Sequence, residues 1–308
     1  MSHHWGYVGA LLSAVLFGLV ASLNKILLVD VDPLVVAGLT YFTAGTTLLV
    51  INFTPARKKI LALLETPSKS EESMTRRDYM LLLAITLFGS ILAPLFFNYG
   101  LANTTAANSS LLLNTETLFT ILIAFAFLGE RLLKKDYTGI GILILGSFIL
   151  TVHGSLFQID LSEGLLGNML ILLACLFWGI DNNLSRKISI QENLIQITAI
   201  KCSLGGSILL LSSLPLGIGW GITLLSLPYL FIVGTLGIGF SLILFLLALR
   251  EIGVSKTGVI FSTSTMFGVI FAFLFLGETI SLIQISVGLM MILGIYLVYR
   301  SQNTTLST

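Results

Sequence analysis

A six-residue phrase that occurs twice decides how this chain is organised. "FAFLGE" at residues 125–130 and "FLFLGE" at residues 273–278 each end an apolar run on a glycine and a glutamate. The two glutamates, Glu130 and Glu278, lie 148 residues apart in a chain of 308 residues. A phrase that returns after about half the chain predicts two related halves.

The similarity between the halves extends beyond this phrase. The same offset of 148 places Gly89 over Gly237 and Phe119 over Phe267. An offset of 161 aligns "LFGLVASLNKI" at 16–26 with "FWGIDNNLSRK" at 177–187. The difference between the offsets is absorbed by a long loop at 54–77. We therefore predict a first half over residues 1–153 and a second half over residues 154–308.

Composition indicates that the lipid bilayer is the solvent. Hydrophobic residues make up 56% of the chain, charged residues 10%, and the mean hydropathy is +1.00. Soluble domains carry about 25% charged residues, so this chain lacks the polar side chains to cover itself in water. A net charge of +1 argues against nucleic acid as a partner. The two cysteines, Cys175 and Cys202, lie inside apolar segments and are interpreted as packing residues.

Ten apolar segments approach or exceed the ~20 residues that a helix needs to cross about 30 Å of hydrocarbon. They lie near residues 5–29, 33–53, 78–100, 106–128, 137–153, 164–184, 193–213, 228–249, 254–276 and 281–299. Polar stretches such as "REIGVSK" at 250–256 separate them. The expected fold is an all-α membrane protein with ten transmembrane helices, five in each half.

The basic residues set the orientation of these spans. All of the 16 lysines and arginines except Lys25 and Lys201 fall in alternate loops or in the C-terminal tail. Because positively charged loops stay in the cytoplasm, both termini are predicted to be cytoplasmic, in a multi-pass protein of the plasma (inner) membrane. Five spans is an odd number, so the second half enters the membrane inverted. A 5+5 inverted-topology repeat is typical of secondary transporters.

With this organisation, the chain resembles the drug/metabolite transporter superfamily, and in particular its EamA-type ten-helix members. The local match is best in "NSSLLLNTETLFTILIAFAFLGERL" at 108–132. The resemblance implies a transporter of small metabolites, often an exporter, with a cavity lined mainly by spans 1, 3, 4, 6, 8 and 9. The chain departs from the family pattern at Thr117, where proline is common, and at Thr40, where arginine is common. Lys201 takes the corresponding point of the second half, and the substrate stays open.

Charged residues inside a membrane are costly and are therefore functional candidates. Glu116 lies in the middle of the fourth span, and its counterpart in the second half is Ser264. Glu116 is predicted to line the cavity, where it binds a cationic substrate group or carries a coupling proton. The alternative is a protonated carboxyl group that hydrogen-bonds a neighbouring helix.

Asp181 and Lys201 are predicted to face each other from spans 6 and 7, because an ion pair offsets the desolvation of both charges. The pair is either a structural clasp or inner gate, or part of a substrate site. Lys25, at the outer end of the first span near Asp30 and Asp32, is expected to extend to the interface.

Uncharged polar and aromatic residues complete the set of candidates. Asn24, Asn98, Asn114, Asn182 and Asn183 either face the cavity or join helices. Trp178 and Tyr99 either stack on a substrate or pack against lipid and core. The repeated glycines and glutamates are predicted to be structural or hinge residues: Gly129 and Gly277 end their helices in a left-handed conformation, and Glu130 and Glu278 cap the helices that follow.

Enzyme chemistry finds little support. The histidines His3, His4 and His153 lie at the terminus or in a loop, and there is no HExxH motif, no GxxxxGK[ST] phosphate loop and no Asp-rich diphosphate motif. We predict no metal, no cofactor and no catalytic residue. The expected partners are a small-molecule substrate, the bilayer and protons as a candidate coupling ion, for a monomer or homodimer. A membrane enzyme, a lipid-binding scaffold and a passive channel remain the alternatives.

Overall fold

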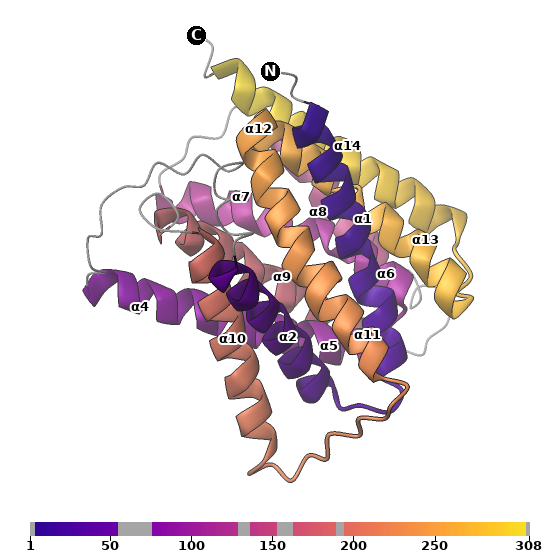
Figure 1. Cartoon of the computed structure of the whole chain (residues 1–308). Helices are drawn as coiled ribbons and strands as arrows, with labels where there is room; N and C mark the ends of the chain where they lie inside the picture. The colour runs from indigo at the N-terminus through magenta and orange to yellow at the C-terminus, as the bar shows by residue number, and fades with distance from the viewer. Residues whose placement is uncertain (1–3, 55–75, 129–135, 153–162, 189–193, 306–308) are drawn as a thin grey trace.

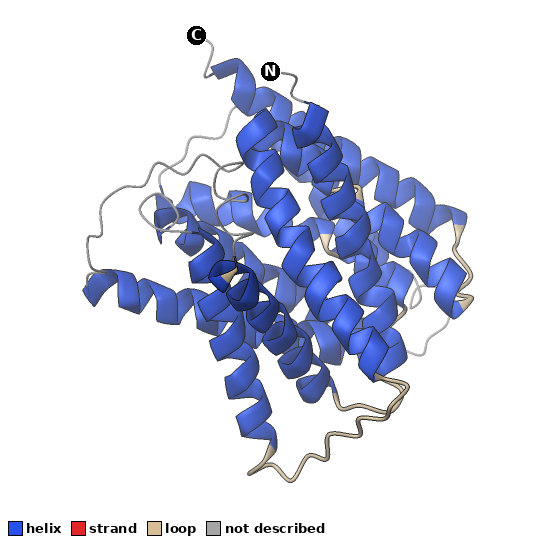
Figure 2. Cartoon of the chain, viewed as in Figure 1, coloured by secondary structure: helices blue, strands red, loops and turns tan. Residues whose placement is uncertain are grey.

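The computed structural model describes residues 4–54, 76–128, 136–152, 163–188 and 194–305. These residues form helices joined by turns and loops, and none of them lies in a strand (Figure 2). The start of α1 and the end of α14 lie at the same end of the molecule (Figure 1).

The first half begins with two unbroken helices, α1 (His4–Leu27) and α2 (Pro33–Phe53). The third span is continuous but irregular: α4 (Arg76–Ile85), the π-helix η1 (Thr86–Leu92) and α5 (Ala93–Ala102) follow without a gap. The fourth span is divided at Leu113 into α6 (Ala106–Leu112) and α7 (Asn114–Leu128). The half ends with α8 (Asp136–Val152).

The second half follows a similar order of elements. It consists of α9 (Glu163–Ile188), α10 (Leu194–Ser213), α11 (Leu227–Phe231), the π-helix η2 (Ile232–Phe240), α12 (Ser241–Phe261), α13 (Ser264–Leu276) and α14 (Leu282–Thr305). The single helix α12 stands in the place of α5 and α6. The irregular positions of the third and fourth spans thus recur in the second half, as η2 and as the break between α12 and α13.

Eight helices of the described residues are long and apolar enough to cross a membrane, and two shorter apolar helices, Tyr137–Thr151 and Leu282–Leu297, accompany them. Their ranges overlap the ten predicted segments. The polar stretch at 250–256 was predicted to separate two spans. This prediction is wrong, because the backbone stays helical through these residues in α12. In the first half, the hydroxyl of Thr105 accepts a hydrogen bond from the Asn108 amide and starts α6. The counterpart of Thr105 is Gly253, which has no side chain to begin a new helix.

The helices pack in pairs that alternate between the halves. α2 lies against α10, α1 against α12 and α13, α8 against α14, and α9 against α5 and α7. At the crossing of α2 and α10, a Cβ at Gly45 would overlap the backbone of Ser203, and one at Gly206 would overlap the backbone of Phe42. The absence of both side chains is therefore what allows this close approach. The main apolar core includes Leu101, Leu111, Leu112, Leu143 and Met291 from α5, α6, α8 and α14, together with buried residues of α1, α9 and α13.

Candidate functional site

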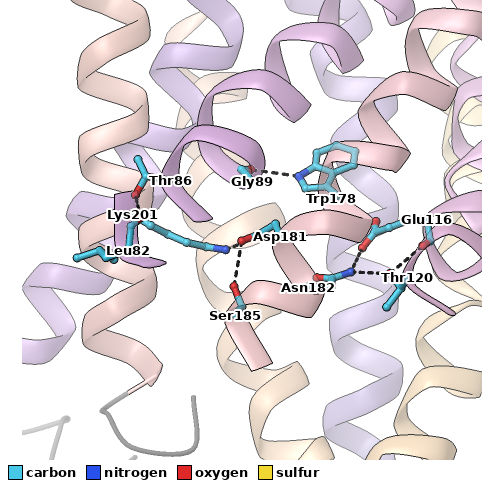
Figure 3. A network of polar contacts seen from close by, with 10 residues as sticks. All are labelled: Leu82, Thr86, Gly89, Glu116, Thr120, Trp178, Asp181, Asn182, Ser185 and Lys201. Atoms are coloured by element: carbon cyan, nitrogen blue, oxygen red, sulfur yellow. Dashed lines mark hydrogen bonds and ion pairs between the residues drawn. The ribbon is translucent and has the colours of Figure 1, made fainter. Parts of the chain in front are cut away.

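Polar side chains gather around the second half of α9, where irregular parts of two other helices meet it (Figure 3). α9 packs against η1 on one side and against α7 on the other. Its Asp181 and Ser185 share one helix face at a spacing of four residues, and Trp178 and Asn182 share the next. Helical periodicity thus directs two polar pairs from one helix toward two neighbours.

Asp181 of the first pair forms a buried ion pair with Lys201 of α10. Lys201 Nζ lies 2.6 Å from Asp181 Oδ2, and the two side chains are only 15% and 7% exposed. Ser185 Oγ donates to the other carboxylate oxygen of Asp181 at 2.9 Å. Gly89 of η1 leaves the room for this carboxylate, because a Cβ there would collide with it. The pairing inferred from the sequence is present, and its role in transport stays a prediction.

The second pair reaches Glu116, which lies in the first turn of α7 just after the break at Leu113. Asn182 Nδ2 donates to Glu116 Oε1 at 2.8 Å and to Thr120 Oγ1 at 3.2 Å. The Thr120 hydroxyl donates in turn to the backbone carbonyl of Glu116 at 2.8 Å. Glu116 is half-buried and Asn182 is exposed. Glu116 as a residue is therefore more exposed than Asp181, which is buried.

Trp178 adds an aromatic group to this cluster. The indole N–H of Trp178 donates to the backbone carbonyl of Gly89 at 3.2 Å. Five residues beyond Gly89, at the spacing of a π-helix, lies Pro94, which has no N–H to offer that carbonyl. The Trp178 ring packs against Phe97 with 5.6 Å between ring centroids, and Tyr41 of α2 lies near Trp178. The irregular helix thus supplies the acceptor that orients the indole.

Several predicted candidates make contacts of their own. Asn24 donates to Asn98 at 3.0 Å, and Asn98 donates to the carbonyl of Pro94 at 2.8 Å, so this pair joins α1 to α5. Asn114 donates to Thr265 Oγ1 at 3.2 Å. The hydroxyl of Tyr99 lies 3.5 Å from Asp32 Oδ1. Asn24, Asn98 and Asn114 thus join helices in this structure, and a substrate contact for these residues or for Tyr99 stays a prediction.

The set predicted from sequence lacks Thr120, Ser185 and Tyr41, which belong to the cluster in the structure. Thr120 and Ser185 stand four residues after Glu116 and Asp181, so helical spacing was the available signal for both. Nothing in the sequence near Tyr41 indicates that α2 brings it to Trp178. Within the described residues, no three His, Cys, Asp or Glu side chains gather as metal ligands.

Glu278 was predicted to cap the helix that follows it, and this prediction is wrong because its partner is another helix. Gly277 does end α13 with φ of 65°. Glu278, however, accepts hydrogen bonds from the Ala106 and Ala107 amides of α6, at 2.7 and 2.8 Å, and not from the helix that follows it. That helix, α14, is capped by its own residues, because Ser281 and Gln284 exchange hydrogen bonds of 3.0 and 3.1 Å. Gly129 and Glu130 lie outside the described residues.

Lys25 has partners that its prediction did not name, and its extension to the interface stays a prediction. Its ammonium group donates to the carbonyls of Leu101, Ala102 and Thr104 at 2.7, 3.1 and 2.8 Å. Lys25 therefore binds the carbonyl end of α5 and the turn after it, where three acceptors left over by the helix end converge.

Comparison with known proteins gives the family of the chain. A model described as "EamA-like transporter family" matches residues 4–152 and 165–300. A protein of Methanothermobacter thermautotrophicus described as an uncharacterized transporter is 39% identical, over 97% of this chain and 87% of its own length. The Bacillus subtilis proteins described as uncharacterized transporters YoaV and YyaM are 26% and 25% identical, and the matches cover 87% and 77% of this chain and the same shares of those proteins.

One solved crystal structure superimposes with a TM-score of 0.66 at 16% identity, over 100% of both chains. At that identity the likeness shows the fold alone. The family match and the relative at 39% identity show that the chain belongs to the EamA-like transporter family. It is a multi-pass membrane protein and a transporter.

Proposed function

We propose that this EamA-family transporter moves small polar or amphipathic metabolites by alternating access, through ten spans arranged as an inverted repeat with both termini in the cytoplasm. Export across the plasma membrane is favoured by the family, and amino acids or related compounds are the leading substrate class. The cluster of Glu116, Asp181 and Lys201 around α9 carries this proposal. It puts charges of both signs inside a membrane protein, where charge indicates a substrate or ion path.

Contacts that recur between the halves support the inverted repeat. Gly45 lies on Ser203, and Gly206, its counterpart at the offset of 161, lies on Phe42, which is the counterpart of Ser203. The exchange of roles is what a twofold axis between α2 and α10 would produce. The π-helices η1 and η2 support the same axis, because they overlap at the offset of 148.

A second pair of contacts follows the same rule. Gly18 of α1 lies against Phe267 of α13, and Gly179 of α9 lies against Phe119 of α7. The sequence offsets relate the two glycines and the two phenylalanines. Two equivalent crossings of small residues on aromatic ones provide surfaces on which the halves can rock about a central site.

The charges do not follow this symmetry. The positions equivalent to Asp181, Lys201 and Glu116 hold Val20, Thr40 and Ser264. The protein would therefore have a single charged binding site, on one side of the proposed axis, and not two sites related by that axis. Glu116 is the group for a substrate ammonium, Lys201 for a substrate carboxylate that displaces Asp181, and Trp178 and Tyr41 are the aromatic surface for an apolar part.

Glu116 is also the proposed proton carrier. Asp181 is matched by the positive charge of Lys201, whereas the donor to Glu116 in the described residues is the neutral amide of Asn182. A carboxyl group that faces a neutral amide can exchange a proton for a cationic substrate group without leaving an unpaired buried charge. Such exchange would couple substrate movement in one direction to proton movement in the other.

The test is counterflow in proteoliposomes, with substrates chosen by a thermal-shift screen of a metabolite panel, because a ligand of the folded state raises its Tm. Saturable counterflow is expected for a transporter, whereas non-saturable flux would indicate a channel and ligand binding without flux a scaffold or enzyme. Glu116→Gln should retain binding of neutral ligands and lose the pH dependence of transport. Asp30→Asn, which removes an exposed carboxylate, is the matched control. Unchanged rates and pH dependence in Glu116→Gln would remove the coupling assignment.

A further inference from the structure

The turn between α5 and α6 is held by two opposite charges at one end of the molecule. Lys25 donates to three carbonyls at the end of α5 and in the turn. Glu278 accepts from the first two amides of α6. Each charge thus meets the helix end whose partial charge it complements, and the two side chains also lie close enough to attract each other.

The Glu278 contact joins the two halves. Glu278 follows α13 in the second half, and Ala106 and Ala107 open α6 in the first, 172 and 171 residues away. Two charge-assisted hydrogen bonds to neighbouring amides fix both the distance and the angle between a carboxylate and a helix end. The contact is therefore specific to one relative position of the halves.

The same interface continues from Glu278 into the membrane. Ser110 of α6 lies against Gly268 of α13, and Leu111 lies against Gly288 of α14. The hydrogen bond from Asn114 to Thr265 closes the interface near the helix break. All seven residues of α6 are buried. The first half of the fourth span thus packs mainly against α13 of the second half, with α1, α8 and α9 as further neighbours.

Accessibility changes beyond the break at Leu113. Glu116 and Thr120 of α7 are half-buried, and Asn182 beside them is exposed. The side chains of the polar cluster are thus more exposed in this structure than the fully buried α6. A transporter that alternates must later open the α6 end, and this requires α6 to part from α13.

We propose that Glu278 is the gate residue of the α6 end: its carboxylate holds α6 closed against the second half, and the substrate path opens at that end only when the carboxylate leaves the Ala106 and Ala107 amides. This inference rests on the proposed alternating function. The release is reversible, because a carboxylate and two helix-terminal amides at the end of a span can each be taken up by water. α14 does not need Glu278, because Ser281 and Gln284 cap it.

The experiment measures the distance between the halves at this end. Nitroxide labels at Ala102→Cys and Leu282→Cys, two exposed positions, report it in nanodiscs, in a chain whose Cys175 and Cys202 are replaced by alanine. Glu278→Gln keeps the size of the side chain, removes its charge and leaves one of the two amides without an acceptor. Asp30→Asn removes an exposed carboxylate that has no such contact, and is the control.

The unaltered protein should give mainly the short distance. Charge-assisted hydrogen bonds contribute about 1.5–3 kcal/mol, so Glu278→Gln should raise the ratio of open to closed molecules by roughly 10- to 100-fold. Asp30→Asn should leave the ratio unchanged. A distance distribution in Glu278→Gln equal to that of the unaltered protein would overturn the proposal, and so would an equal shift in Asp30→Asn.

A second variant tests the same contact from its other side. Ala106→Pro removes the amide that donates to Glu278 Oε1 and leaves the carboxylate intact. Ala106 is the first residue of α6, where proline is tolerated, and the preceding Thr105 has the extended backbone that proline requires, with φ of −77° and ψ of 151°. A smaller shift toward the open state, about 3- to 10-fold, is expected for the loss of one hydrogen bond. No shift in Ala106→Pro would reject the gate even if Glu278→Gln failed to fold.

These distances need no substrate, so they separate the gate from the transport proposal. A shift in Glu278→Gln with no counterflow for any substrate would support the gate and reject the transport cycle proposed above. If the protein showed counterflow but Glu278→Gln left the label distances unchanged, the transport proposal would be supported and the gate rejected.

Discussion

Removing the charge of Lys201 alone should destabilise the protein more than removing the charges of Lys201 and its partner Asp181 together. Lys201→Met leaves the Asp181 carboxylate in place with the Ser185 hydroxyl as its remaining donor in the described residues. Asp181→Asn together with Lys201→Met removes both charges at nearly constant volume. The comparison therefore separates the energy of an unpaired buried charge from that of the ion pair itself.

The magnitude follows from the burial of the pair. Exposed ion pairs contribute about 0–1 kcal/mol, whereas removal of one partner from a buried pair costs about 3–5 kcal/mol, because the other charge stays desolvated. With side chains 7% and 15% exposed, Asp181 and Lys201 belong to the second class. Lys201→Met is therefore expected to lower the free energy of unfolding by about 3–5 kcal/mol. The double variant should lose less, by about 1–3 kcal/mol of coupling between neighbouring sites.

The assay is a double-mutant cycle on thermal or denaturant unfolding in one detergent, followed by tryptophan fluorescence or by loss of the monodisperse peak. The four proteins are the unaltered chain, Asp181→Asn, Lys201→Met and the double variant. Asp30→Asn controls for the removal of an exposed charge and should change stability by less than about 0.5 kcal/mol.

Two outcomes would refute this reasoning. If Lys201→Met lost less than about 1 kcal/mol, the pair would behave as a solvated surface pair in spite of its burial. If the two single losses summed to the loss of the double variant, Asp181 and Lys201 would not be coupled, and a clasp or gate built on their contact would be excluded.

Three further predictions concern glycines and are checked by the same unfolding measurements. Gly89→Ala should destabilise the protein by roughly 1–3 kcal/mol, because its Cβ would collide with the Asp181 carboxylate. The control Gly141→Ala, whose Cβ would have nothing within 4 Å, should be neutral or stabilise helix α8 by about 0.5–1 kcal/mol. Equal effects of the two substitutions on stability would contradict this. Gly45→Ala and Gly206→Ala should cost similar amounts, since each Cβ meets backbone across the α2–α10 crossing, and a large effect in only one would speak against the twofold axis. Gly277→Ala should cost about 1–2 kcal/mol from its φ of 65° alone, so an unchanged Tm would indicate that the turn rearranges.

The helices were predictable because each depends on its own residues. The range predicted for the second span, 33–53, agrees with α2, where Asp32 caps the helix by accepting from the Leu34 amide and Pro33 opens it. Gly277 was predictable for the same reason, since a glycine that ends an apolar helix favours the left-handed conformation. The continuation of α12 through 250–256 was not predicted, because a polar stretch marks a loop only when some residue in it ends or caps a helix.

The candidate site was predictable in part. Asp181 and Lys201 could be paired because two adjacent antiparallel spans put residues at similar depth side by side. Glu116 and Asn182 are 66 residues apart, and their contact depends on α9 packing against α7 with Gly179 on Phe119. The partner of Glu278 was misassigned because local capping rules consider only the helix that follows.

The sequence by itself therefore determined the solvent, the spans and the presence of buried charge, since hydropathy and helix ends depend on neighbours within a few residues. Only the tertiary structure decided that Asp181 and Asn182 of α9 contact two different helices, that Lys25 and Glu278 hold the same turn, and that "FLFLGE" ends in a contact with the other half. Those contacts depend on how close two helices approach and which turns face each other. That information is distributed over glycines and side chains that lie far apart in the sequence.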